Sequence, residues 1–146
     1  MQTHYAKSIG PREELCPLFK DVFKFHWMDE SRHVVLDELE WKAEHEKLSP
    51  AECDQAVNDL IALVAAVDAI LQAQSASDAD YFARNVSRSF SLDQAAQIKT
   101  CVLGAYRWQY IISGVQHPHF VRLLTHMTTP AQMARIQSAL APIFSH

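Results

Sequence analysis

The chain has 146 residues, of which 49% are hydrophobic and 21% charged, and its formal net charge is −4. This composition is typical of a globular protein and provides no basic field, so we expect no nucleic-acid partner. The longest apolar run, Leu60 to Leu71, contains Asp68 and is too short to cross a bilayer, and the N-terminus lacks an apolar signal core. We therefore expect no membrane partner.

Cysteine usage agrees with an intracellular protein. Cys16, Cys53 and Cys101 are widely spaced, odd in number and without a Cys-x-x-Cys pair. Such thiols are typical of a reducing compartment and do not form a disulfide frame or a zinc ribbon. The predicted location is the cytoplasm.

Helix start and stop signals divide the chain, and no alternating strand pattern interrupts them. Ser49 and Ser91 each begin a capping box, and His117–Pro118 and Thr129–Pro130 mark two further boundaries. The second helix is expected to reach Gln74, and a bent or broken continuation to Val86 is left open. The other expected helices run from Pro11 to about Leu48, from Leu92 to about Gln116, from Pro118 to about Met127, and from Pro130 to about Phe144.

This pattern predicts an all-α fold, a helical bundle with three long helices and short C-terminal ones. Residues 1–146 are expected to form a single domain, and the short connections favour near-antiparallel packing. The second helix is expected to bury Val57, Leu60, Ile61, Val64, Leu71 and Phe82. The third is expected to bury Ile98, Cys101, Ala105, Trp108, Ile112 and Val115.

The expected inward face of the first helix is unusual because its apolar start gives way to ionisable residues. Leu15, Phe19 and Val22 lie on one side of the helix, opposite Lys20 and Lys24. Buried without partners, ionisable groups would cost several kcal/mol each, so they need one another, water or a cation. Continued by steps of three and four, the apolar side carries His26, Glu30, His33, Asp37 and Glu40.

The spacing His26-x-x-x-Glu30-x-x-His33 favours a cation, since neighbouring members are one turn apart. Imidazole with carboxylate suits iron, manganese or zinc, and Asp37 is placed to accept the second ring N–H of His33. The alternative is a metal-free seam of hydrogen-bonded polar side chains.

The segment FHWMDESRH contains the Glu-x-x-His of the ferritin-like di-iron carboxylate proteins. With His26, it resembles the His-x-x-x-Glu-x-x-His helix of the di-iron arylamine N-oxygenases, over roughly Phe19 to Glu40. This resemblance implies that His26, Glu30 and His33 bind iron. That family also has a second Glu-x-x-His and two further glutamates on other helices, and this chain has no second Glu-x-x-His.

Within the expected apolar face of the second helix, Asp68 is the best candidate for a further metal ligand. A buried carboxylate bonded to His or Arg without metal is the competing interpretation. Three explanations of the incomplete ligand set remain open. The site is mononuclear, a second subunit completes it, or the chain corresponds to the C-terminal part of a longer ancestral protein and the site is degenerate.

The leading functional hypothesis is therefore a helical-bundle metalloprotein, with an iron-dependent oxidoreductase acting on dioxygen or peroxide as the implied enzyme class. Its substrate is not readable from the residues. The alternative is a metal-free helical module for oligomerisation or partner binding with a buried polar seam. A homodimer or higher homo-oligomer is expected in either case, since long helices in a small domain leave apolar flanks uncovered. The aromatic cluster Tyr106–Tyr110 is interpreted as core, with an aromatic-ligand pocket as its alternative.

Overall fold

The structure, a computed structural model, describes residues 5–145, and this stretch contains helices and connecting turns but no strand. The predicted all-α fold is therefore confirmed. The chain divides into two compact units, Met1–Leu48 and Ser49–His146, called unit 1 and unit 2 below. The single domain expected over residues 1–146 stays a prediction.

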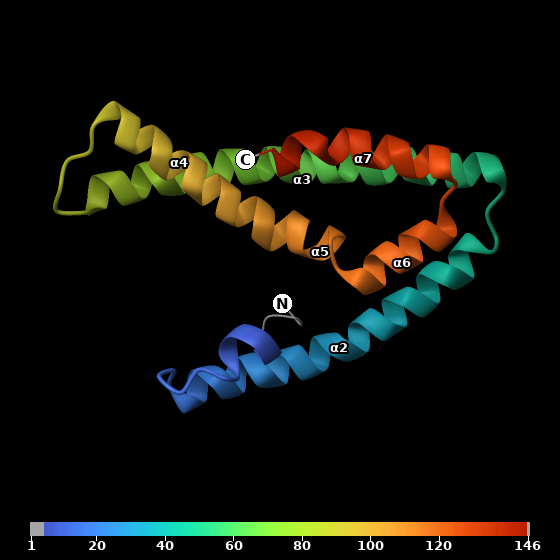
Figure 1. Ribbon diagram of the computed structural model, residues 1–146, viewed down its shortest axis with the longest axis horizontal. Helices are drawn as coiled ribbons and strands as arrows, with labels where there is room; N and C mark the ends of the chain where they lie inside the picture. Colours follow the sequence, from blue (N-terminus) through green and yellow to red (C-terminus); the bar gives the residue numbers. More distant parts are fainter. Residues whose placement is uncertain (1–4, 146) are drawn as a thin grey trace. The chain divides into compact units, whose positions relative to one another are not determined.

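Unit 1 consists of a π-helical turn, η1, at Tyr5–Ile9 and one long helix, α2, at Pro17–His45 (Figure 1). The predicted helix start at Pro11 is wrong. Cys16 has extended backbone angles, because a residue that precedes proline is disfavoured in the α region, and Pro17 then opens the helix.

Unit 2 contains the remaining helices, and their bounds agree closely with the helix start and stop signals of the sequence. The helices are α3 at Pro50–Asn85, α4 at Leu92–Arg107, α5 at Ser113–Val115, α6 at Pro118–Met127 and α7 at Pro130–Phe144, with a π-helical stretch, η2, at Trp108–Ile112.

Side chains at the N-caps fix the starts of three of these helices as predicted. Ser49, Ser91 and Thr129 each accept a hydrogen bond from a backbone N–H three residues on, and the side chain at that position bonds back to the N-cap N–H. The helix that begins after Ser49 continues unbroken through Ser75, which settles its open continuation in favour of one long helix.

α3 is the central element of unit 2, because both α4 and α7 pack against it. α4 runs antiparallel to α3, since Arg107 near its end binds Asp68, whereas Lys99 nearer its start lies 3.2 Å from Asp80. This pair confirms the antiparallel packing that a short connection favours.

α7 runs in the same direction as α3 (Figure 1). Arg135 near its start donates to Asp54 near the start of α3 at 2.7 Å, and Ile143 near its end lies in one cluster with Leu71. The antiparallel expectation fails for this pair because α5 and α6 return the chain before α7 begins.

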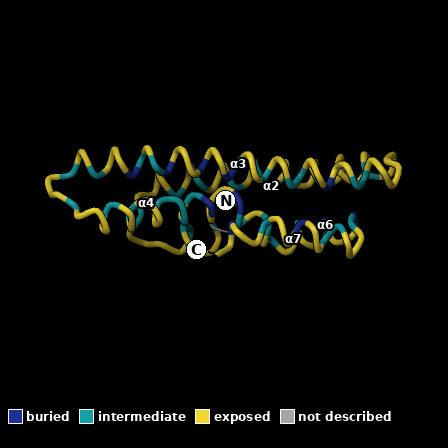
Figure 2. The backbone as a smooth tube through the Cα atoms, turned by 90° about the horizontal axis from the view of Figure 1, so that it is seen from above, coloured by how far each residue is buried: buried dark blue, intermediate teal, exposed yellow. Residues whose placement is uncertain are grey.

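Two small apolar clusters form the core of unit 2. The buried positions of α3 recur at intervals along the helix, with exposed positions between them (Figure 2). The cluster members that are themselves buried are Val57, Leu124 and Ile136 in one, and Leu71, Ile111 and Ile143 in the other.

The predicted inward face of α3 is confirmed from Val57 to Leu71, but Phe82 is 48% exposed. Phe82 lies close to the end of α3 and contacts Phe90 instead, with ring centroids 5.9 Å apart. Side chains near this end of α3 are covered less by neighbouring helices than those in the middle of α3.

The predicted inward face of the third helix is wrong at three of its six residues. Cys101, Ala105 and Trp108 are exposed, whereas Tyr106 and Arg107 turn toward α3. The prediction followed apolar and small residues, and it did not anticipate that carboxylates on α3 would draw a tyrosine and an arginine inward.

α3 is also long and apolar enough to cross a membrane, judged by length and composition alone. The sequence analysis considered only the run from Leu60 to Leu71, whereas the helix is continuous over Pro50–Asn85. Within unit 2 the same helix packs against α4 and α7 and buries Asp68. The expected absence of a membrane partner stays a prediction.

The core assignment predicts a graded loss of stability at Ile136, which is 3% exposed. Ile136→Ala is expected to lower the free energy of unfolding by about 2–5 kcal/mol, and Ile136→Val by about 0.5–1.5 kcal/mol, because buried methyl groups are removed. The matched control is Ile70→Ala, since Ile70 is 67% exposed on α3. Urea denaturation measures all three, and an equal loss in the control would contradict the assignment.

Candidate functional site

The ionisable residues predicted on the first helix do share one face of α2. Glu30 lies between His26 and His33, one turn from each. The Nδ1 atom of His26 is 3.9 Å from one carboxylate oxygen of Glu30, and the Nδ1 atom of His33 is 3.6 Å from the other. The three side chains, called the α2 triad below, therefore lie next to one another on one face of α2.

The α2 triad is accessible on unit 1. Its side chains are between 41% and 56% exposed, and none of the residues of α2, all of which are described, is buried. Asp37 lies one turn further along and is also exposed. No described side chain, that of His33 included, donates a hydrogen bond to the Asp37 carboxylate, so the predicted contact with the imidazole is not formed here.

The distances within the triad are informative about metal binding. Two donors that share one tetrahedral ion at about 2.1 Å lie roughly 3.4 Å apart, a few tenths of an ångström less than both separations. Among residues 5–145, however, no three His, Cys, Asp or Glu side chains gather closely enough to hold a metal ion. The triad has suitable donors and spacing, but its three groups do not close on a single point.

Asp68, the fifth predicted site residue, is held in unit 2 by an arginine from another helix. Arg107 donates from Nε to Oδ1 at 2.7 Å and from Nη2 to Oδ2 at 2.8 Å, and Gln72 donates to Oδ2 at 2.6 Å. This arrangement matches the competing interpretation of a buried carboxylate paired with arginine. The metal role of Asp68 stays a prediction.

The ion pair lies in the interior of unit 2. Asp68 is 7% exposed and Arg107 is 6% exposed. The two parallel hydrogen bonds offset the free-energy cost of removing water from both charges. An exposed ion pair does not have this cost, because its charges stay hydrated. The remaining nitrogen of the guanidinium, Nη1 of Arg107, is buried and has no hydrogen-bond acceptor among the described residues.

A second polar contact joins α3 to α4 one helix turn beyond Ser75. The hydroxyl of Tyr106 donates to a carboxylate oxygen of Asp78 at 2.6 Å. This hydrogen bond lowers the pKa of Asp78, with a smaller contribution from Gln74, and raises the pKa of Tyr106. The ring of Tyr106 meets that of Tyr110 edge to face, but Trp108 and Tyr110 are 44% and 66% exposed, so the interpretation of the aromatic cluster as core is wrong for these two residues.

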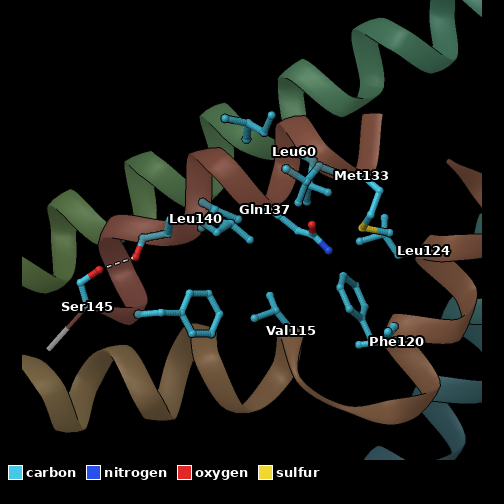
Figure 3. A pocket seen from close by; sticks show the side chains of 14 residues that line it. Leu60, Val115, Phe120, Leu124, Met133, Gln137, Leu140 and Ser145 are labelled. Atoms are coloured by element: carbon cyan, nitrogen blue, oxygen red, sulfur yellow. Dashed lines mark hydrogen bonds between the residues drawn. The ribbon is translucent and has the colours of Figure 1, made fainter. Parts of the chain in front are cut away.

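A pocket of about 440 Å³ lies within unit 2 among α3, α5, α6 and α7 (Figure 3). Its size is within the range of small-molecule sites. Gln137 and Ser145 are the polar residues among its described lining, and the Ser145 hydroxyl donates to the Ala141 carbonyl at 2.8 Å. No charged side chain of the described chain lines it, so it offers no ion pair to a phosphate or a carboxylate.

This pocket was not predicted from the sequence. Its walls are ordinary apolar residues of four helices, such as Phe120 and Leu140, and their spacing does not differ from that of a closed core. Gln137 is the polar residue that α7 contributes to the lining, and it is exposed.

The buried ion pair predicts a double-mutant result. Arg107→Met is expected to lower the free energy of unfolding by about 3–5 kcal/mol, because Asp68 would remain buried without a countercharge. Adding Asp68→Leu to that variant is expected to recover much of the loss, since no charge is then buried. Urea denaturation measures the cycle.

The matched control is Arg135→Met, because Arg135 and Asp54 form an exposed pair whose loss is expected to cost under about 1 kcal/mol. If the double variant at residues 68 and 107 is as unstable as the sum of its two single variants, the two charges are independent and the assignment is wrong.

Comparison of the chain with protein-family models, with curated proteins and with solved structures finds no match. The likeness of α2 to the di-iron arylamine N-oxygenases therefore depends on His26, Glu30 and His33 alone.

Proposed function

We propose that this chain is a helical metalloprotein in which the α2 triad, His26, Glu30 and His33, provides one side of a metal site. The observation that carries the proposal is the convergence of both imidazoles on the two oxygens of one carboxylate, at 3.9 Å and 3.6 Å. Apart from Asp37, the remaining donors are water for a mononuclear site, or carboxylates of a second chain for a di-iron-type site.

The donor set determines which ions are suitable. Neutral imidazole with carboxylate suits iron, manganese and zinc, and iron is the ion that the resemblance of α2 implies. A bound iron ion would supply the activation of dioxygen or peroxide, which makes an oxidoreductase the corresponding enzyme class. The chain's own contribution is a regular helix that holds three donors one turn apart.

The two other predicted site residues, Asp37 and Asp68, have different parts in this proposal. Asp37 is exposed one turn beyond His33 and serves as a further ligand or as a hydrogen-bond acceptor for the imidazole. Asp68 keeps its ion pair with Arg107, and metal binding by the triad does not require it. The exposed thiols of Cys16 and Cys101 suit the reducing cytoplasm in which such a protein would work.

The proposal predicts a metal-dependent melting temperature. Iron(II), manganese(II) or zinc(II) at a hundredfold excess over Kd is expected to stabilise the protein by roughly 3 kcal/mol, because only the folded helix presents the triad. Glu30→Ala and His33→Ala are expected to remove this gain and to weaken metal binding about tenfold or more, measured by calorimetric titration without a histidine tag.

Matched control variants are Glu46→Ala and His126→Ala, which remove an exposed carboxylate and an exposed imidazole that do not belong to the triad. Both are expected to bind metal as the wild type does. A melting temperature that neither a chelator nor any of the three ions changes would exclude the metalloprotein function.

A second candidate function is a metal-free module for self-association, and one observation favours it. α2 has 29 residues, all described, and buries none of them, although large apolar side chains such as Leu18, Phe25 and Leu39 are more than half exposed. Contiguous apolar surface on this scale marks an interaction site. In this candidate the polar residues of α2 contribute specificity rather than catalysis.

Self-association predicts a homodimer or higher oligomer at micromolar concentration, measured by sedimentation in the presence of a chelator. Phe25→Ser is expected to weaken association at least about tenfold without loss of helicity, because the side chain is 64% exposed. Ile70→Ser, at a residue 67% exposed on α3, is the matched control. A wild-type chain that sediments as a monomer would overturn this candidate.

A further inference from the structure

One side of α2 carries a heptad pattern that is separate from the triad. Between residues 18 and 35, six residues follow one another at alternating steps of three and four, which are the a and d positions of a coiled coil, and Leu39 extends the pattern by one step. They are called the α2 seam: Leu18, Asp21, Phe25, Met28, Arg32 and Val35.

The α2 seam lies roughly 140° around the helix from the triad, at 100° per residue. All six seam residues are exposed, and its four apolar members are between 42% and 72% exposed. Two large aliphatic side chains, one aromatic ring and a thioether in a row are unfavourable in water. The seam therefore has the composition of a surface that another helix covers.

The two charged members of the seam, Asp21 and Arg32, indicate which helix covers it. No described residue forms a hydrogen bond or an ion pair with either side chain. Both occupy positions that a coiled coil normally fills with apolar residues, where an unpaired charge is costly. A partner helix must therefore offer the opposite charge at each of these two levels.

A second copy of α2 meets this requirement in one orientation. When two copies are antiparallel and centred between Phe25 and Met28, Leu18 faces the partner's Val35, and Phe25 faces the partner's Met28. In the same register Asp21 faces the partner's Arg32. Every a position then meets a d position, which is the layer pattern of an antiparallel pair, and each charge meets its opposite.

The parallel orientation is disfavoured by the same two residues. In a parallel pair in register, Asp21 would face the partner's Asp21 and Arg32 would face the partner's Arg32. Like charges opposite each other at an interface are strongly unfavourable. The order apolar, acid, apolar, apolar, base, apolar therefore selects direction as well as register.

We infer that two copies of this chain pair through the α2 seam as an antiparallel helix dimer, held in register by two cross-pairs between Asp21 and the partner's Arg32. The inference rests on the self-association candidate and adds its surface, direction and register. Pairing through the seam leaves the triad on the outer side of both helices, so it does not depend on metal.

Charge reversal tests the inference in the full chain, with sedimentation equilibrium in the presence of a chelator as the measurement. Arg32→Asp and Asp21→Arg, made singly, are each expected to weaken the dimer at least about tenfold, because each places like charges together twice. The combined variant, Asp21→Arg with Arg32→Asp, is expected to regain wild-type affinity within about threefold. Circular dichroism checks that helix content is unchanged.

Asp37→Arg is the matched control, because it makes the same acid-to-arginine change on the opposite side of α2 and is expected to leave the dimer unchanged. A wild-type dimer that no single reversal weakens, or a combined variant that is no tighter than the single ones, would overturn the register while leaving self-association in place. A monomeric wild type would overturn both.

Discussion

The ion pair between Asp68 and Arg107 is the constraint on which the arrangement of unit 2 depends. It fixes α4 against α3 at one level, with two hydrogen bonds of 2.7 and 2.8 Å between two largely buried side chains. The apolar cluster with Leu71 follows directly along the same face of α3. A sliding or rotated α4 would separate the two charges, so the pair specifies register where the apolar side chains would tolerate several.

The sequence predicted local features of this fold better than its long-range ones. Helix starts at Ser49, Ser91 and Thr129 were predictable because their capping interactions involve residues three apart. Asp68 and Arg107 are 39 residues apart in the sequence, and the periodicity of neither helix predicts their contact. Sequence reasoning found that Asp68 needed a partner, and the partner itself was beyond its reach.

In the candidate site, too, local geometry was predictable from the sequence and burial was not. The spacing of His26, Glu30 and His33 was sufficient to place the three on one face of α2, since a helix of regular geometry fixes it. Their exposure on unit 1 was not predictable from the apolar residues that precede them, because burial depends on what packs against the helix. The seam from Leu18 to Val35 shares the helix with the triad, so one element carries two surfaces of different chemistry.

The π-helical stretch η2 determines which residues before and after it face α3. Leu103, Arg107, Ile111 and Val115 all lie toward α3 and its apolar clusters, although they are spaced four residues apart. In a regular α-helix each step of four overshoots a full turn by about 40°, so four such residues would spiral away from a straight partner. A wider turn at Trp108–Ile112 absorbs this drift. The chain thereby keeps one cationic position and three aliphatic ones aligned on a single neighbour. Shortening the stretch by one residue would rotate the positions on its two sides out of alignment.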